Sequence, residues 1–336
     1  MSYDRRRDIS ILFGDPNRGM RMQYRAALRS EGFTLLHEFD SLENFPALFQ
    51  KAQPDLIFMD AAMPGGDPSG TVQALRHGEL GTNPFIPVII ATWDASRSVV
   101  HRIIDCGADD VLVKPLSTQA ISGRIQALAD NRKPFVVTAD YIGPDRRRNT
   151  RPGAGDPELL AVPNPLRAKL AGVSPGGDEF RGQVEMMRGQ IGRLRLKAAA
   201  FRVAFVAAQL EDILAVGKGA VSEEGQMLLS GLQASAEDMR SRLTGLGGHE
   251  SELSLSEHLL DTVRPLIGMT DNRRRDDKNS VSTIQSVAAV LLQAFSPDRS
   301  GEELAAEVAA AIGRYRALRR ARTEAGARPG RRPGRH

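Results

Sequence analysis

The first 130 residues alternate between short apolar runs and longer segments that are apolar on one side only. Bounded apolar runs of four to six residues are typical of buried strands, whereas apolar positions three and four apart are typical of helices. The runs predict strands at 9–13, 34–39, 56–59, 88–91 and 110–113. The intervening and following segments predict helices at 18–30, 41–50, 71–76, 96–106 and 117–130. Strands that alternate with helices predict a parallel, doubly wound α/β sheet.

The first predicted helix, 18–30, is amphipathic. Met22, Ala26 and Leu28 mark the side that we expect to face the sheet. Gly32 follows the helix, and glycine is common just past a helix end.

Composition changes after Asn131. Residues 131–179 carry many prolines and glycines, which predicts a linker between two domains. Two pieces of it are less polar or more basic than a plain linker, Phe135–Thr138 and Tyr141–Arg148. The sequence leaves two alternatives open, a plain linker or a segment that docks on the first domain.

A helical period begins at Phe180. Apolar residues recur at alternating gaps of three and four, at Val184, Met187, Ile191, Leu194, Ala198, Phe201, Phe205 and Ala208. This spacing is typical of a dimeric coiled-coil seam or of one face of an intramolecular bundle. Further helices are predicted at 223–243, 255–267, 280–295 and 301–320. The expected division is therefore 8–130, a linker at 131–179, a helical output or dimerisation region at 180–320, and a disordered basic tail at 321–336.

Composition narrows the class of protein. The chain has 336 residues, enough for two domains, and its one cysteine, Cys106, excludes an internal disulfide and fits the cytoplasm. No apolar run is long enough to span a membrane, and the first residues do not resemble a signal peptide. Seven arginines and one glutamate from Arg319 onward contribute +6 to a net charge of +4, which leaves about −2 for the rest. Nucleic-acid binding is therefore not expected of the body of the protein.

Three reactive side chains stand where predicted strands end. Asp60 ends one apolar run, Thr92 ends the next, and Lys114–Pro115 follows the last. In an open parallel sheet these strand ends meet at one crevice, where ligands bind. A carboxylate, a hydroxyl and an ammonium group in that crevice suit the acceptance and sensing of a phosphoryl group.

These residues carry a resemblance to a known family. With Met63–Pro64 and the glycine that follows, residues 8–130 resemble the receiver domains of bacterial two-component response regulators. The resemblance implies a five-stranded flavodoxin-like sheet with strand order 2-1-3-4-5, followed here by a mostly helical region. It implies that Asp60 is the phosphoacceptor, Thr92 the switch residue and Lys114 the partner of the phosphoryl oxygens. It also implies a cis Lys114–Pro115 bond.

The resemblance implies a Mg²⁺ site as well, formed by Asp15, Asp60 and the backbone carbonyl of Ala62. Receiver domains normally have two neighbouring acids after the first strand. In this chain the two positions are either Asp15 and Pro16 or Gly14 and Asp15, so one carboxylate is missing in both registers. Mg²⁺ can fill vacant positions with water, so we expect weaker binding rather than none. Asp67 is open to two interpretations, a substitute ligand or a turn residue.

The expected function is that of a phosphorelay response regulator rather than an enzyme. A sensor histidine kinase or phosphotransfer protein would donate to Asp60, and the helical region would change homodimerisation or the binding of a downstream protein that the sequence does not identify. One alternative is a pseudo-receiver, a scaffold that phosphorylation does not regulate. Another is non-specific nucleic-acid binding through the arginine-rich tail, which phosphate contacts alone would make sensitive to salt.

Overall fold

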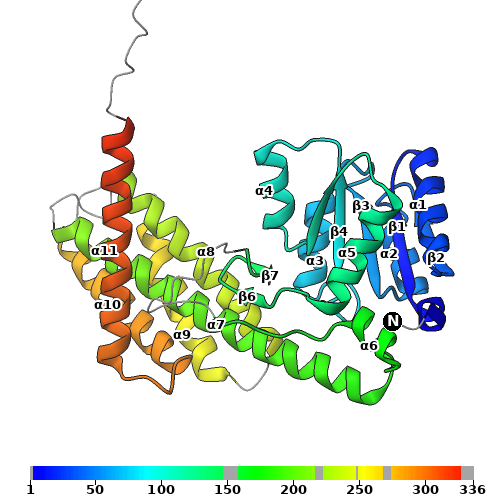
Figure 1. The fold of residues 1–336 in the computed structure, drawn as a ribbon. Helices are drawn as coiled ribbons and strands as arrows, with labels where there is room; N and C mark the ends of the chain where they lie inside the picture. Colours follow the sequence, from blue (N-terminus) through cyan, green and yellow to red (C-terminus); the bar gives the residue numbers. More distant parts are fainter. Residues whose placement is uncertain (1–2, 147–157, 216–221, 247–248, 268–273, 327–336) are drawn as a thin grey trace, which may run out of the picture. The chain divides into compact units, whose positions relative to one another are not determined.

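The computed structural model describes residues 3–146, 158–215, 222–246, 249–267 and 274–326 (Figure 1). Contacts divide the chain into two compact units, residues 1–192 and 193–336. Each unit is described by itself below.

The N-terminal unit contains a five-stranded parallel sheet. After a short 3₁₀ helix, η1 (Tyr3–Asp8), its strands are β1 (Ser10–Gly14), β2 (Leu35–Phe39), β3 (Leu56–Asp60), β4 (Val88–Thr92) and β5 (Asp110–Val113). Their order is β2-β1-β3-β4-β5, and every neighbouring pair is parallel. The predicted fold class and strand order are confirmed.

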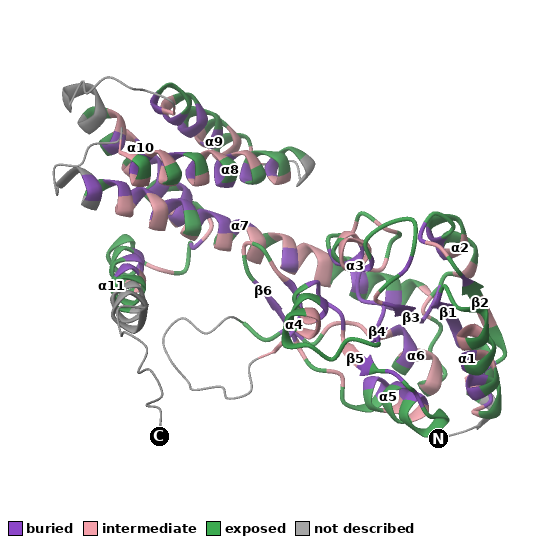
Figure 2. Ribbon diagram, turned by 90° about the horizontal axis from the view of Figure 1, so that it is seen from above, coloured by how far each residue is buried: buried purple, intermediate pink, exposed green. Residues whose placement is uncertain are grey.

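Helices cover both faces of this sheet. Side chains alternate along β1, so that Ile11 and Phe13 pack on one face and Leu12 on the other. The first face is covered by α1 (Arg18–Ser30) and α5 (Thr118–Asp130). The second is covered by α2 (Phe45–Ala52), α3 (Pro68–Arg76) and α4 (Arg97–Asp105). Figure 2 shows the buried strands between helices whose outer sides are exposed.

The inward face of α1 differs from the predicted one. Tyr24, Ala27 and Leu28 are buried, whereas Met22 is 62% exposed and Ala26 is also exposed. Positions 24, 27 and 28 follow the three-and-four spacing of a helix face. Of the three predicted positions, only Leu28 is buried. Tyr24 takes the place expected of Met22, because its ring packs in the core and its hydroxyl donates a hydrogen bond to Asp15.

The segment after α5 docks on the N-terminal unit, which was one of the two alternatives. It contains an antiparallel pair, β6 (Phe135–Val137) and β7 (Ile142–Pro144), and the helix α6 (Pro165–Ala171). Leu166 of α6 is fully buried in the core under α1 and α5, and Lys169 pairs with Asp55 at 2.6 Å. Residues 147 and 148 lie outside the described residues.

The second unit is helical. Its elements are the end of α7 (Asp178–Ala215), α8 (Glu223–Leu246), α9 (Glu250–Val263) with η2 (Arg264–Leu266), α10 (Arg274–Ala294) and α11 (Gly301–Gly326). The disordered tail was predicted to begin at residue 321. This start is wrong, because α11 continues to Gly326 and residues 321–326 are helical. Residues 327–336 of that predicted tail lie outside the described ones. Within the described helices, we find none both long and apolar enough to cross a bilayer.

The core of the second unit is built within one chain. Leu196, Val203 and Leu210 of α7 are buried together with side chains of the later helices, such as Leu232, Leu260 and Leu291. In the predicted apolar stripe of α7, Phe201, Phe205 and Ala208 are partly buried against the same core. This part of the stripe is thus one face of an intramolecular bundle, and a dimer seam stays a prediction.

Candidate functional site

Four polar side chains meet at the C-terminal edge of the sheet. Asp60 and Thr92 are the last residues of β3 and β4, and Asp15 and Lys114 directly follow β1 and β5. The parallel register sets Asp60 beside Ala91 and Thr92 beside Val113. All four side chains belong to residues that are no more than 5% exposed. The structure therefore places Asp15, Asp60, Thr92 and Lys114 at one edge of the sheet, whereas Asp67 lies at the start of α3.

Lys114 joins the two carboxylates. Its Nζ lies 2.5 Å from Oδ2 of Asp15 and also pairs with Oδ2 of Asp60. The other oxygens accept backbone hydrogen bonds, from Ala62 N to Asp60 Oδ1 at 2.6 Å and from Asn17 N to Asp15 Oδ1 at 2.9 Å. Two carboxylates against one ammonium group leave an excess of negative charge in a buried place. That excess favours a further cation.

One oxygen of Asp60 stands out. Its Oδ2 is buried and pairs with Lys114 by charge and distance, yet it accepts no hydrogen bond of acceptable geometry. Buried polar atoms in native structures almost always have hydrogen-bond partners. Asp60 Oδ2 is paired with Lys114 and can accept a further bond through its remaining lone pair.

Thr92 connects the site to the loop before α4. Its Oγ1 accepts a hydrogen bond from Asp94 N at 3.1 Å. Asp94 Oδ1 in turn accepts one from Ser96 N at 2.7 Å, and this bond lowers the pKa of Asp94. Ser96 is the residue that precedes α4. A hydroxyl that turned from this loop toward Asp60 would change the support of the first turn of α4.

Two aromatic residues complete the site. The hydroxyl of Tyr24 donates to Asp15 Oδ2 at 3.2 Å, and burial, followed by the charge of Asp15, raises the pKa of Tyr24. The ring of Trp93 lies 5.6 Å from Lys114 Nζ and is 63% exposed. Sequence reasoning missed the role of Tyr24. The available signal was its helical spacing from Ala27 and Leu28, which indicates the inward face of α1.

The residues present fit a Mg²⁺ ion with a small protein share. Asp15 and Asp60 are adjacent carboxylates, whereas Pro16 supplies none, and the described part of the chain holds no cluster of three or more metal-binding side chains of the His, Cys, Asp or Glu type. Mg²⁺ is often held by one or two carboxylates, with waters and phosphate oxygens as its other ligands. The excess negative charge and the remaining lone pair of Asp60 Oδ2 fit such an ion.

Asp67 is a turn residue and not a substitute ligand. Its two carboxylate oxygens accept hydrogen bonds from Ser69 N at 3.0 Å and Gly70 N at 3.1 Å, which caps the start of α3. The predicted cis peptide between Lys114 and Pro115 is present.

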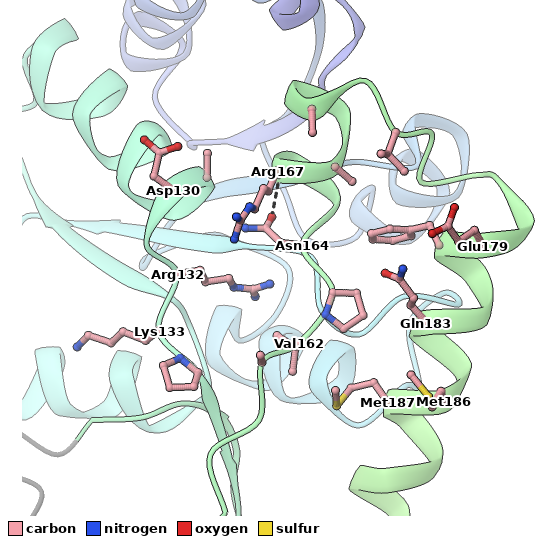
Figure 3. A pocket seen from close by; sticks show the side chains of 18 residues that line it. Asp130, Arg132, Lys133, Val162, Asn164, Arg167, Glu179, Gln183, Met186 and Met187 are labelled. Carbon is pink, nitrogen blue, oxygen red and sulfur yellow. Dashed lines mark hydrogen bonds between the residues drawn. The ribbon is translucent and has the colours of Figure 1, made fainter. Parts of the chain in front are cut away.

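A separate cavity of about 760 Å³ lies between the end of α5, α6 and the start of α7. Figure 3 shows Asp130 and Glu179 on opposite sides of it. Arg132, which also lines the cavity, is already bonded to Asp109 at 2.7 Å. Because its charged groups do not converge, we assign no chemistry to this cavity.

Comparison with known proteins places the site in a family. Residues 11–126 match the family model of the response regulator receiver domain. This segment, which contains Asp15, Asp60, Thr92 and Lys114, is therefore a response regulator receiver domain.

Individual relatives match this chain over a segment of similar length. Response regulator MprA of Mycobacterium tuberculosis (strain H37Rv) is 30% identical over 128 residues, which are 38% of this chain and 53% of that protein. MprA of Mycobacterium leprae is 31% identical with the same coverage. The chain thus spans about half the length of these curated relatives. The solved structure of the chemotaxis protein CheY4 of Vibrio cholerae is 24% identical and covers 35% of this chain and 96% of its own, with a TM-score of 0.32.

Proposed function

We propose that the protein is a phosphorelay response regulator in which Asp60 accepts a phosphoryl group from a phosphohistidine. The donor is a sensor histidine kinase or a phosphotransfer protein, and we place the exchange in the cytoplasm. The observation that carries the proposal is the contact of Lys114 with both Asp15 and Asp60 in a buried crevice at the strand ends.

The chemistry needs little beyond these side chains. Oδ2 of Asp60 attacks phosphorus, the bond from phosphorus to the imidazole nitrogen breaks, and its electron pair stays with the imidazole. Lys114 moves from the carboxylate to the new phosphoryl oxygens and offsets their charge. Bound at Asp15, Asp60 and the carbonyl of Ala62, Mg²⁺ would supply positive charge against the same oxygens.

Thr92 senses the new group. Its hydroxyl is within one loop of α4 and can exchange its bond with Asp94 for one with a phosphoryl oxygen. Hydrolysis resets the switch: a water oxygen attacks phosphorus, the bond to Asp60 breaks, and inorganic phosphate, the free carboxylate and a proton result. In this proposal the helical region converts the change into altered homodimerisation or altered binding of a downstream protein.

The test uses acetyl phosphate or beryllofluoride with Mg²⁺. Trp93 is the only tryptophan and adjoins Thr92, so its fluorescence should change on treatment. Intact-mass spectrometry after acetyl phosphate should show a gain of about 80 Da, the mass of one phosphoryl group, on the wild-type chain. Asp60→Asn should abolish both responses.

Asp40→Asn is the matched control. Asp40 directly follows β2 at the same edge of the sheet, but its side chain is 58% exposed and is not bonded to Lys114. This variant should respond like the wild type. An equal mass gain on Asp60→Asn would contradict the proposal.

The second candidate function is a scaffold that phosphorylation does not regulate. Pro16 favours it, because this residue offers no carboxylate where receiver domains usually have a second acid. A folded wild-type chain that shows neither a fluorescence response nor a mass gain at millimolar Mg²⁺ would establish the scaffold and exclude the switch. We propose no function for residues 327–336, the arginine-rich end, which lie outside the described residues.

A further inference from the structure

The hairpin formed by β6 and β7, residues 135–144, lies beyond the segment that matches the receiver family. Its strands pair in the register Phe135–Pro144, Val136–Gly143 and Val137–Ile142. Asp145 N donates to Pro134 O at 2.8 Å, and Phe135 exchanges two backbone hydrogen bonds with Leu160. The hairpin therefore has a fixed conformation in this structure and can transmit a displacement.

The open end of the hairpin, where Phe135 pairs with Pro144, is anchored at the base of the sheet. The ring of Phe135 lies 5.2 Å from the guanidinium carbon of Arg76 and 4.8 Å from that of Arg132. Both arginines bond to the buried carboxylate of Asp109, just before β5. This anchor is at the N-terminal edge of the strands, opposite Asp60.

The same open end of the hairpin also contacts the C-terminal end of α4. Arg146, two residues after β7, pairs with Asp105, the last residue of α4, and stacks 3.4 Å from the centre of the Tyr141 ring. The backbones also meet here. A Cβ atom on Gly107 would lie 2.6 Å from Ile142 O, and one on Gly143 would lie 2.8 Å from the Cα of Gly107. Any shift at this end of α4 therefore displaces β7 as well.

The helix α4 is also the sheet helix with the weakest anchorage. Only Ile103 of its nine residues is buried, whereas α2 has two buried residues, α1 three, and α3 and α5 four each. Figure 2 shows α4 mostly exposed or half-buried. Its N-terminus begins after Ser96, which is linked through Asp94 to Thr92. A helix with so little buried surface moves at the lowest free-energy cost.

We propose that the hairpin moves with α4 and transmits a shift of this helix to the chain beyond the receiver. This inference rests on the proposed function, because it needs Thr92 to respond at Asp60. When Thr92 leaves Asp94, α4 loses support at its start and shifts. The pair between Arg146 and Asp105 and the contact between Gly107 and Gly143 then loosen. In this structure the contact between the hairpin and α4 is present together with the direct pair between Lys114 and Asp60. The contact therefore favours the unphosphorylated state.

Hydrogen exchange with mass spectrometry on the full chain tests the inference. With beryllofluoride and Mg²⁺, exchange should change in residues 92–98 and rise in residues 135–146. In Arg146→Gln and Asp105→Asn, the hairpin should already exchange faster without the ligand, and the ligand should add little there, while 92–98 still respond. Arg124→Gln is the matched control, because Arg124 forms a surface pair with Asp110 and should leave the hairpin response intact.

The coupling must also be reciprocal. Arg146→Gln should raise the affinity for beryllofluoride about 1.5- to 5-fold, as expected for the loss of one surface ion pair. Trp93 fluorescence titration measures it. A wild-type chain that responds at 92–98 but not at 135–146 would overturn this inference alone. So would a full hairpin response in both Arg146→Gln and Asp105→Asn. The absence of any response at 92–98 would instead contradict the proposed function.

Discussion

Lys114 is the residue on which the site is centred, since it contacts carboxylates from two neighbouring strands. A compact ammonium group on a flexible stem can follow its counter-charge from a carboxylate to a phosphoryl group. An arginine could not follow as easily, because its planar fork is matched to one bidentate partner. The geometry thus explains why this position suits lysine.

Pro16 sets the expected strength of Mg²⁺ binding. We expect Pro16→Asp to tighten Mg²⁺ binding about tenfold, equal to about 1.4 kcal/mol, because a hard cation gains a second neighbouring carboxylate. Titration of Trp93 fluorescence with Mg²⁺ measures the affinity. Pro16→Asn, with a similar shape but no charge, is the control. Equal affinities in the two variants would show that residue 16 does not face the ion.

Tyr24 should make the stability of the N-terminal unit sensitive to alkali. Its pKa is raised by burial and by Asp15, so above pH 10 the folded chain keeps a proton that the unfolded chain releases. Folded molecules then bind more protons than unfolded ones, and the free energy of unfolding falls as pH rises above 10, by up to about 1.4 kcal/mol per pH unit. Below pH 10 this effect is absent.

Tyr24→Phe should remove that part of the slope. Urea unfolding followed by Trp93 fluorescence at pH 8, 10 and 10.5 provides the comparison. At pH 8 the variant should lose only about 0.5–1.5 kcal/mol, the contribution of one hydrogen bond. Tyr141, whose pKa burial also raises, gives a residual slope in both proteins. Identical slopes in wild type and variant would contradict the role assigned to Tyr24.

Among the elements, the strands were the most predictable from the sequence. Runs such as Leu56–Met59 are apolar without interruption because both faces of a parallel strand are buried. Their polar ends, Asp60 and Thr92, were predictable for the same reason. The buried face of α1 was not predictable, because Tyr24 has both an apolar ring and a polar hydroxyl. The sequence does not show which of the two decides whether the residue is buried.

The hairpin and α6 were less predictable still. Their proline and glycine content is that of a linker, and their partners are far away in the sequence: Phe135 meets Arg76, and Lys169 meets Asp55. No local pattern reports such contacts. The apolar run at Phe135–Thr138 was a correct but insufficient signal. The end of α11 was also predicted wrongly, because the arginine-rich composition after residue 320 indicated disorder whereas the helix continues to Gly326.

Asp109 should contribute strongly to the attachment of the hairpin. Asp109→Asn leaves Arg76 and Arg132 buried without their counter-charge, and we expect a loss of about 3–5 kcal/mol in the free energy of unfolding. Burial already lowers the pKa of Arg76 to about 10, which shows how unfavourable its charge is there. Asp110→Asn, one residue further, breaks only a surface pair and should cost less than about 1 kcal/mol.

Urea unfolding followed by Trp93 fluorescence reports the N-terminal unit alone, because the chain's one tryptophan lies there. Similar losses in Asp109→Asn and Asp110→Asn would contradict the assigned role of the buried cluster.

At the scale of the whole molecule, the chain consists of two units that meet within the sequence at Gly192. Gly192 is one of three glycines in α7, each of which lowers the helical propensity of this helix. The receiver match covers only the first unit, at residues 11–126. The second unit has its own buried core, so its fold does not depend on the contacts of the first.

The helical unit should therefore fold alone. We expect a fragment of residues 178–326 to be helical by circular dichroism and to have the mass of a monomer by sedimentation, because its core is complete within one chain. Dilution over a hundredfold range should leave its helicity unchanged. A fragment that is helical only at high concentration would show that the apolar stripe of α7 is a dimer seam after all.

The attachment of residues 135–146 and 158–171 to the N-terminal unit has a practical consequence for protein engineering. Chimeric regulators are made by transplanting a receiver onto a foreign effector, and the natural junction to choose is the end of α5, at Asp130. In this protein such a cut would strip Phe135 from two stacked guanidinium groups and Leu166 from the interior. A working fusion should instead retain the sequence through Gly172, which extends the transplantable module 46 residues beyond the end of the family match at residue 126.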